Sequence, residues 1–79
     1  MSKVIKKKIL PNYFTDVKEQ RKNFEIRKDE DDIKAGDLIV LCEWDGEKYT
    51  GNKIMRTVKY VLRNVPQYGL AEGYCIIGW

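Results

Sequence analysis

Three charged side chains that could bind a phosphate or a base occur close together, at Lys22, Glu25 and Arg27. If residues 23–28 form a strand, Glu25 and Arg27 project from one face about 6.5–7 Å apart, and Lys22 can lean over that face. Arginine donates paired hydrogen bonds to a phosphate, and a carboxylate accepts one from the exocyclic amine of a base. This spacing is compatible with a mixed-charge cleft for RNA or a nucleotide. The alternative is a surface ion network that contributes little to stability.

A second group of candidate residues follows in the sequence, at Glu43, Trp44, Tyr49 and Thr50. Aromatic side chains beside a basic groove commonly stack an unpaired base. We therefore predict that Trp44 and Tyr49 line the rim of the cleft, with Glu43 and Thr50 as neighbouring polar ligands. In the alternative interpretation, the two aromatic rings only cover one end of the fold.

Generic enzyme motifs are missing from the sequence. The chain has no histidine, so it cannot form a Ser-His-Asp or Cys-His arrangement, and it has no glycine-rich phosphate loop. The only acid–base candidates are Lys22 with Glu25 or Glu43, and they would need burial to shift their pKa values. Cys42 and Cys75 lack metal-ligand spacing and are predicted to be reduced core thiols. We predict no metal and no cofactor, and a binding module rather than an enzyme.

Elements that could position these residues follow from the hydrophobic pattern. Leu10, Tyr13, Phe14 and Val17 form one apolar face of a helix that Pro11 opens and that should end near residue 20. Strands are expected at residues 3–9, 23–28, 38–44, 54–63 and 73–79. This pattern predicts an α+β fold: a small mixed β-barrel of five to six strands, with one helix after the first strand.

Several more local expectations can be stated. The strand at 54–63 should be the longest, and the acidic residues 29–32 should form a loop. Gly36 should turn the chain with a positive φ, and the lysines at 6–8 should protect a sheet edge and contribute only diffuse attraction. The predicted core includes several aromatic and aliphatic residues from the strands: Phe24, Ile26, Tyr60, Tyr74 and Ile76.

Charge is strongly segregated along the 79 residues, although the net charge is only +3. Residues 1–28 carry nine cations and three anions, residues 29–47 one cation and eight anions, and residues 48–79 five cations and one anion. Such a division can orient a polyanion, or it can belong to solvated loops. The length predicts a single domain over residues 1–79. Without an apolar signal segment or a membrane-spanning run, we expect a cytoplasmic monomer that does not bind membranes.

The segment around Lys22 resembles the signature of the ASCH family (activating signal cointegrator homology), whose barrel is similar to the PUA domain. That signature is G-x-K-x-x-x-x-R at the junction of the first helix and second strand, followed by Gly-Asp before the next strand. Lys22 and Arg27 occupy the Lys and Arg positions, Gly36-Asp37 follows, and Gln20 replaces the leading Gly.

A narrower resemblance, to a small ASCH-like subfamily of phages and bacteria, extends from about residue 8 to residue 77. It rests on six short motifs in the same order: Leu10-Pro11-x-Tyr13-Phe14, Phe24-Glu25-Ile26-Arg27, Gly36-Asp37, Glu43-Trp44, Tyr49-Thr50-Gly51 and Tyr68-Gly69-Leu70 with Gly73-Tyr74. That subfamily often has a histidine near its first strand, which this chain lacks.

The resemblance implies RNA binding, and it also raises a hydrolase alternative. Some small ASCH proteins hydrolyse the acetyl amide of modified cytidine nucleosides with a Lys, a Thr and a distant Glu. Lys22 matches the Lys, Glu25 stands at the Thr position, and the distant Glu has no clear counterpart. Three hypotheses result: an RNA- or nucleotide-binding module, an amidohydrolase acting on an N4-acylated cytidine, and a protein-interaction module that uses the basic residues 3–8.

Overall fold

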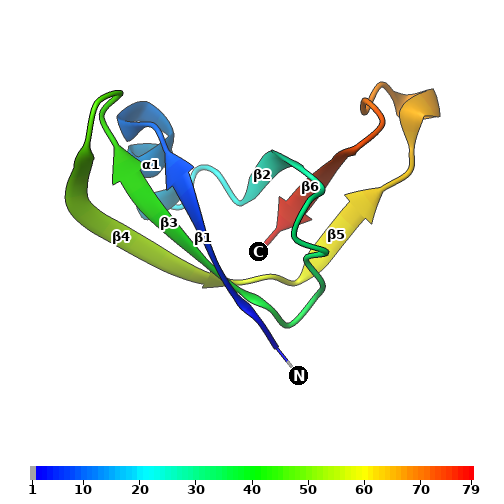
Figure 1. Cartoon of the computed structure of the whole chain (residues 1–79), viewed down its shortest axis with the longest axis horizontal. Coiled ribbons are helices and arrows are strands. Elements are labelled where there is room, and N and C mark those ends of the chain that lie inside the picture. The colour runs from blue at the N-terminus through cyan, green and yellow to red at the C-terminus, as the bar shows by residue number, and fades with distance from the viewer. Residues whose placement is uncertain (1) are drawn as a thin grey trace.

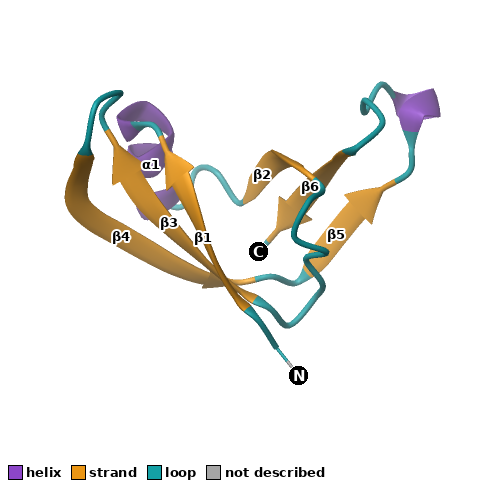
Figure 2. Cartoon of the chain, viewed as in Figure 1, coloured by secondary structure: helices purple, strands orange, loops and turns teal. Residues whose placement is uncertain are grey.

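The computed structural model describes residues 2–79 and has an α+β fold in that range (Figures 1 and 2). Six strands form two sheets. One α-helix follows the first strand, as the sequence predicted. The elements in chain order are β1 (Val4–Ile9), α1 (Pro11–Lys18), β2 (Phe24–Lys28), β3 (Leu38–Trp44), β4 (Tyr49–Thr57), β5 (Tyr60–Arg63), the 3₁₀ turn η1 (Pro66–Tyr68) and β6 (Tyr74–Gly78).

The first sheet has the strand order β1-β3-β4 and the second has the order β2-β6-β5. Strands β1 and β3 are parallel, and the other pairs are antiparallel. Figure 1 shows the two sheets splayed like the arms of a V and joined where β4 passes into β5. The core lies between their inner faces and contains ten buried apolar residues: Ile5, Ile9, Phe14, Val17, Ile33, Ile39, Leu41, Val58, Cys75 and Ile77.

The helix and the turn before β3 agree closely with the predictions made from the sequence. Helix α1 begins at Pro11 and buries Phe14 and Val17, and it ends at Lys18, two residues earlier than expected. Gly36 has φ +97°, as predicted, and its N–H donates to the carbonyl of Val58. Asp37 is buried beside it and accepts hydrogen bonds from the backbone N–H groups of Lys3 and Lys34, each at 2.8 Å.

The prediction of one long strand over residues 54–63 is wrong. Strand β4 begins earlier, at Tyr49, because the Asp45-Gly46 turn pairs it with β3 from the start. The chain then leaves the first sheet at Val58 and Lys59 and enters the second sheet as β5. Val58 is buried at this crossing and exchanges hydrogen bonds with Gly36 and Asp37, so the strand is interrupted where the sheets join.

The predicted core residues of the second sheet are also wrong. Phe24, Ile26, Tyr60 and Tyr74 are exposed, and Ile76 is only partly buried. Strand β2 has the expected alternation, but it buries the opposite face: Glu25, paired with Ile77 in the ladder, is only 6% exposed. The cause is on β6, where Cys75 and Ile77 face the core and oblige their partners on β2 to do the same.

The predictions that both cysteines lie in the core and that the strands form a barrel are confirmed only in part. Both thiols are free, but only Cys75 lies in the core, because Cys42 faces outward from β3 and is partly exposed. The described residues form no closed barrel: β1 pairs only with β3, and β2 pairs only with β6. Side chains bridge the seam between β1 and β2, where Arg27 Nη2 donates to the carbonyl of Lys8 at 2.5 Å.

Candidate nucleic-acid interface

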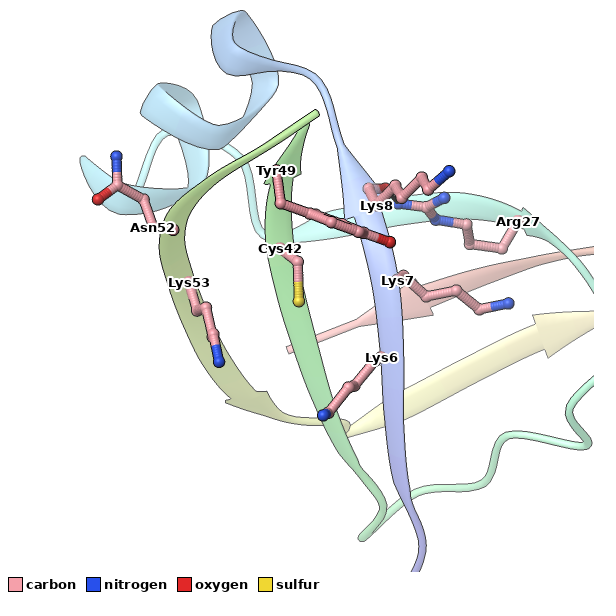
Figure 3. Close-up of a pocket in the computed structure, with 9 residues that line it drawn as sticks. Lys6, Lys7, Lys8, Arg27, Cys42, Tyr49, Asn52 and Lys53 are labelled. Atoms are coloured by element: carbon pink, nitrogen blue, oxygen red, sulfur yellow. Dashed lines mark hydrogen bonds between the residues drawn. The ribbon is translucent and has the colours of Figure 1, made fainter. Parts of the chain in front are cut away.

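A basic pocket occupies the outer face of the first sheet. Because Ile5 and Ile9 of β1 turn toward the core, Lys6 and Lys8 turn outward. The strand register then places Lys8 beside Cys42 of β3, which is in turn beside Lys53 of β4. The resulting cavity, called the lysine pocket below, has a volume of about 650 Å³ and is lined by Lys6, Lys7, Lys8, Arg27, Cys42, Tyr49, Gly51, Asn52 and Lys53 (Figure 3).

An aromatic pair stands at one end of this pocket. The rings of Trp44 and Tyr49 meet edge to face, with centroids 4.9 Å apart. Lys8 Nζ lies 3.9 Å from the centroid of Trp44 and 5.7 Å from that of Tyr49, within the range of cation–π attraction. Tyr49 is 53% exposed, and Figure 3 shows its ring extending across β3 toward β1. The Trp44–Tyr49 pair therefore borders the lysine pocket, not the cavity that Lys22 and Glu25 line.

The charged residues that line the lysine pocket are all positive. None of its lining residues is acidic. Within residues 2–79, the ion pairs do not involve Lys6, Lys8 or Lys53. Lys7 differs, because its side chain leaves the opposite face of β1 and its ammonium group lies 2.5 Å from Asp31. Three lysines thus surround one cavity without a neutralising carboxylate.

Lys22, Glu25 and Arg27 lie together as predicted, but they do not line one cleft, because Arg27 borders the lysine pocket and Lys22 borders a separate cavity. Lys22 Nζ contacts one oxygen of the Glu25 carboxylate, and Arg27 Nη2 lies 2.8 Å from the other. Arg27 also bonds to the Lys8 carbonyl, so its guanidinium joins the Glu25 cluster to the edge of the lysine pocket. Glu25 is therefore neutralised inside the protein and has no free oxygen directed at the lysine pocket.

A smaller pocket of about 360 Å³ lies on the other side of this cluster and is lined by Tyr13, Lys22, Phe24, Glu25 and Ile26. Lys22 Nζ lies 5.2 Å from the ring centroids of both Tyr13 and Phe24. Lys22 also donates to the carbonyl of Phe24 at 2.8 Å. We call this cavity the Lys22 pocket.

Glu43 and Thr50 form a separate polar cluster. Glu43 accepts hydrogen bonds from Thr50 Oγ1 at 2.7 Å and from Asn52 Nδ2 at 3.0 Å. These two donors lower the pKa of Glu43, against the opposing effect of burial. The cluster fixes the hairpin that carries Tyr49. No ion pair joins Glu43 to Lys22 in the described chain, so the predicted Lys22–Glu43 acid–base pair is not formed.

Three cations of the lysine pocket were missed as specific site residues. The lysines at 6–8 were expected to act only diffusely, yet Lys6 and Lys8 flank the cavity. The alternation of Ile5 and Ile9 with Lys6 and Lys8 could have shown that two of the three lysines share an outer face. Lys53 had no local signal, because only the β3–β4 register brings it beside Cys42.

The fold and this site define a small α+β domain with a basic pocket bordered by aromatic residues. Residues 4–79 match the DUF3850 family, a domain of unknown function, and the chain belongs to that family. No curated protein is significantly similar to the chain. No helix within residues 2–79 is long and apolar enough to span a membrane. The same residues contain no cluster of Cys, Asp and Glu arranged to hold a metal ion.

Proposed function

We propose that the protein binds single-stranded RNA or a nucleotide in the lysine pocket. The observation that carries this proposal is the group of three lysines, free of ion pairs, that surrounds a cavity beside the Trp44–Tyr49 pair. Lysine ammonium groups attract phosphates, and an exposed aromatic ring stacks an unpaired base for about 1–3 kcal/mol. The lysines that attract phosphates and the ring that stacks a base therefore lie on the same face of the first sheet.

The mixed-charge cluster has a supporting role in this proposal. Arg27 is held by Glu25 and by the Lys8 carbonyl, so it adds positive charge at the rim of the pocket in a fixed orientation. Glu25, which is also paired with Lys22, holds Arg27 in place from the inner side. Glu43 and Thr50 act through the hairpin, by holding Tyr49 over the pocket.

We also propose that the fold is an open form of the ASCH and PUA-like barrel. Its support is the continuous path from β4 into β5 on one side and the Arg27–Lys8 bridge across the opposite seam. The same resemblance favours an RNA-related role in the cytoplasm of a bacterium or a phage-infected cell, and the free thiols suit a reducing compartment.

The test is fluorescence anisotropy of a labelled single-stranded oligouridylate at several salt concentrations. Lys6→Ala and Lys53→Ala should each weaken binding and lower the slope of log K against log salt by about 0.7, because each removes one phosphate contact. Lys34→Ala is the matched control, because Lys34 is an exposed lysine outside the pocket. Tyr49→Ala should weaken binding roughly 5- to 150-fold, as expected for the loss of one stacked base.

Equal effects of Lys6→Ala, Lys53→Ala and Lys34→Ala, with unchanged slopes, would contradict a localised site. Arg27 is a poor choice for this test, because Arg27→Glu would place a second carboxylate beside buried Glu25 and destabilise the fold. A duplex of the same length serves as a second probe. It should bind more weakly, because its bases are not free to stack on Tyr49.

A nucleoside amidohydrolase is the second candidate. It is supported by the Lys22–Glu25 contact, which places an amine and a carboxylate on the wall of the Lys22 pocket beside two aromatic rings. Incubation with N4-acetylcytidine should then yield cytidine and acetate, and Lys22→Ala should abolish turnover. If the wild-type protein yields no cytidine, this candidate fails while the RNA-binding proposal stands.

A further inference from the structure

The outer face of the second sheet is apolar, although it is exposed to solvent. The β2-β6-β5 register arranges it in rows: Phe24 and Tyr60 on either side of Gly78, then Ile26, Ile76 and Leu62, then Tyr74 beside Lys28. We call these side chains the second-sheet face. Phe24 is 47% exposed, Ile26 56%, Tyr60 67% and Tyr74 38%. Lys28 is the only charged residue among these strand positions.

The exposed apolar area of this face approaches the apolar area that one copy contributes to a homodimer interface. At about 200 Å² for each aromatic side chain, the exposed parts of Phe24, Tyr60 and Tyr74 amount to roughly 300 Å². With Ile26, Leu62 and Ile76, the patch lies in the range of ~300–600 Å² typical of the largest apolar patches on monomers. A standard interface buries about 800 Å² on each partner, and homodimer interfaces are ~65% apolar, so one copy needs about 500 Å² of apolar surface.

Both faces of the second sheet carry apolar side chains, and the inner face also holds Glu25, Arg27 and Arg63. Its inner face supplies Cys75, Ile77 and Val61 to the core, and its outer face is also built from aromatic and aliphatic side chains. Two such faces from identical chains can pack as sheet on sheet about 10 Å apart. Domains of this size bury a smaller fraction of their surface on folding than larger domains do, so additional burial by association can add to their stability.

The rim of this face is basic, so an association through the face does not rest on charge pairing. Lys22, which precedes Phe24, is paired with Glu25. Lys28 lies at one end of the face and Lys59 precedes Tyr60, whereas the strand positions of the face carry no acid. Two copies placed face to face would bring these lysines nearer to one another. Their repulsion is screened by salt, while the apolar contact is not weakened by it.

We propose that the protein forms a symmetric homodimer by packing the second-sheet faces of two copies against each other. The lysine pocket lies on the outer face of the first sheet, so it stays open in this dimer. The assembly then presents two nucleic-acid sites. This replaces the monomer expected from the sequence, and it is independent of the proposed RNA binding.

Sedimentation velocity over a range of protein concentrations tests the dimer. Wild-type protein should dimerise at micromolar concentration, and added salt should leave the dimer equally tight or tighter. Tyr60→Glu should raise the dimer dissociation constant at least tenfold. Tyr68→Glu is the matched control, because Tyr68 is 81% exposed but lies in η1, outside the face, and it should leave the constant unchanged. Both tyrosines are exposed, so both variants should keep the wild-type circular dichroism spectrum.

Three results would overturn the proposal. The first is a wild-type protein that stays monomeric at all concentrations. The second is a dimer that dissociates in salt, which would indicate pairing between the acidic and basic segments. The third is a monomer in which Tyr60→Glu weakens binding of the oligouridylate and Tyr68→Glu does not, which would make the face a platform for RNA bases.

Discussion

The residues of β2 alternate between two faces as the sequence predicted, but the face that is buried is the opposite of the predicted one. Glu25 and Arg27 do share a face, as their spacing predicted, but that face is turned inward. A buried carboxylate is tolerated only when it is paired and hydrogen-bonded, and Lys22 and Arg27 provide this from both sides. The cluster therefore contributes first to the fold, and through Arg27 to the pocket.

Removing Glu25 should destabilise the protein clearly. In Glu25→Ala, Lys22 and Arg27 keep their positions near the core but lose their common anion. The cost of breaking a buried pair is 3–5 kcal/mol, and because both cations are partly exposed we expect about 2–3 kcal/mol. Urea unfolding measures this. Glu47→Ala, at an exposed position in the hairpin turn, should change the free energy of unfolding by less than about 0.5 kcal/mol.

Asp37 should make stability depend on pH in the acid range. Hydrogen bonds from the backbone N–H groups of Lys3 and Lys34, together with the Lys3 ammonium group, lower the pKa of Asp37 to about 2. The unfolded chain has the ordinary value near 3.9 and so binds the proton more tightly. The contribution of Asp37 is therefore present above about pH 4 and is lost as the pH falls through 2.

The urea midpoint, followed from pH 5 to pH 2, measures this effect. Asp37→Asn should lower the midpoint at pH 5 and flatten its decline toward low pH. Glu47→Gln should leave the shape of the curve unchanged. A wild-type curve that is already flat between pH 4 and pH 2 would rule out this role for Asp37.

The two thiols should differ sharply in reactivity toward a disulfide reagent. Cys42 faces the lysine pocket and is partly exposed, whereas Cys75 has no exposed surface, and burial raises the pKa of its thiol. We expect one rapidly modified thiol in the folded protein and two in urea. Bound oligouridylate should slow the reaction of Cys42, and Cys42→Ser should remove the rapid phase. Two fast thiols in the native protein would contradict the burial of Cys75.

At the scale of elements, the turn before β3 decides where the first sheet begins. Gly36 combines a positive φ with open space, since an added Cβ would meet only Ser2 Oγ at 3.9 Å. The cost of a side chain there is backbone strain rather than a clash. This turn also directs Asp37 toward Lys3, which fixes the start of β1.

Gly36→Val should therefore lower the free energy of unfolding by roughly 1–3 kcal/mol through strain at a positive φ. Gly46→Val tests the same strain in the hairpin turn, where nothing lies within 4 Å of an added Cβ. It should cost a similar amount, because only the backbone conformation is penalised. An unchanged melting temperature for Gly36→Val would show that the turn relaxes at no cost.

In the whole molecule, ion pairs connect the acidic and basic segments that are separated along the sequence. The acidic segment 29–47 is bound to both basic segments: Asp29 to Arg63, Asp31 to Lys7 and Asp37 to Lys3. Within residues 2–79, Lys6, Lys8 and Lys53 of the lysine pocket remain without an acidic partner. The net charge of +3 thus understates the local positive charge on the first sheet.

The sequence by itself determined the local features of this protein. These features depend on neighbouring residues, so each can be predicted from a short segment. They are the helix at Pro11, the turns at Gly36 and Asp45-Gly46, and the alternation within residues 4–9 and 24–28. Alternation gives two faces of a strand, but it does not say which one is buried. Charged residues on one face suggested that Phe24 and Ile26 pointed inward.

Only the tertiary structure decided which face met the core. Strand β6 supplies Cys75 and Ile77 to the core and therefore turns Glu25 inward, where Lys22 and Arg27 neutralise it. The lysine pocket likewise depends on the register of three strands, which brings Lys8 and Lys53 to either side of Cys42. These choices depend on contacts between residues far apart in the chain, whose free energies a local pattern does not contain.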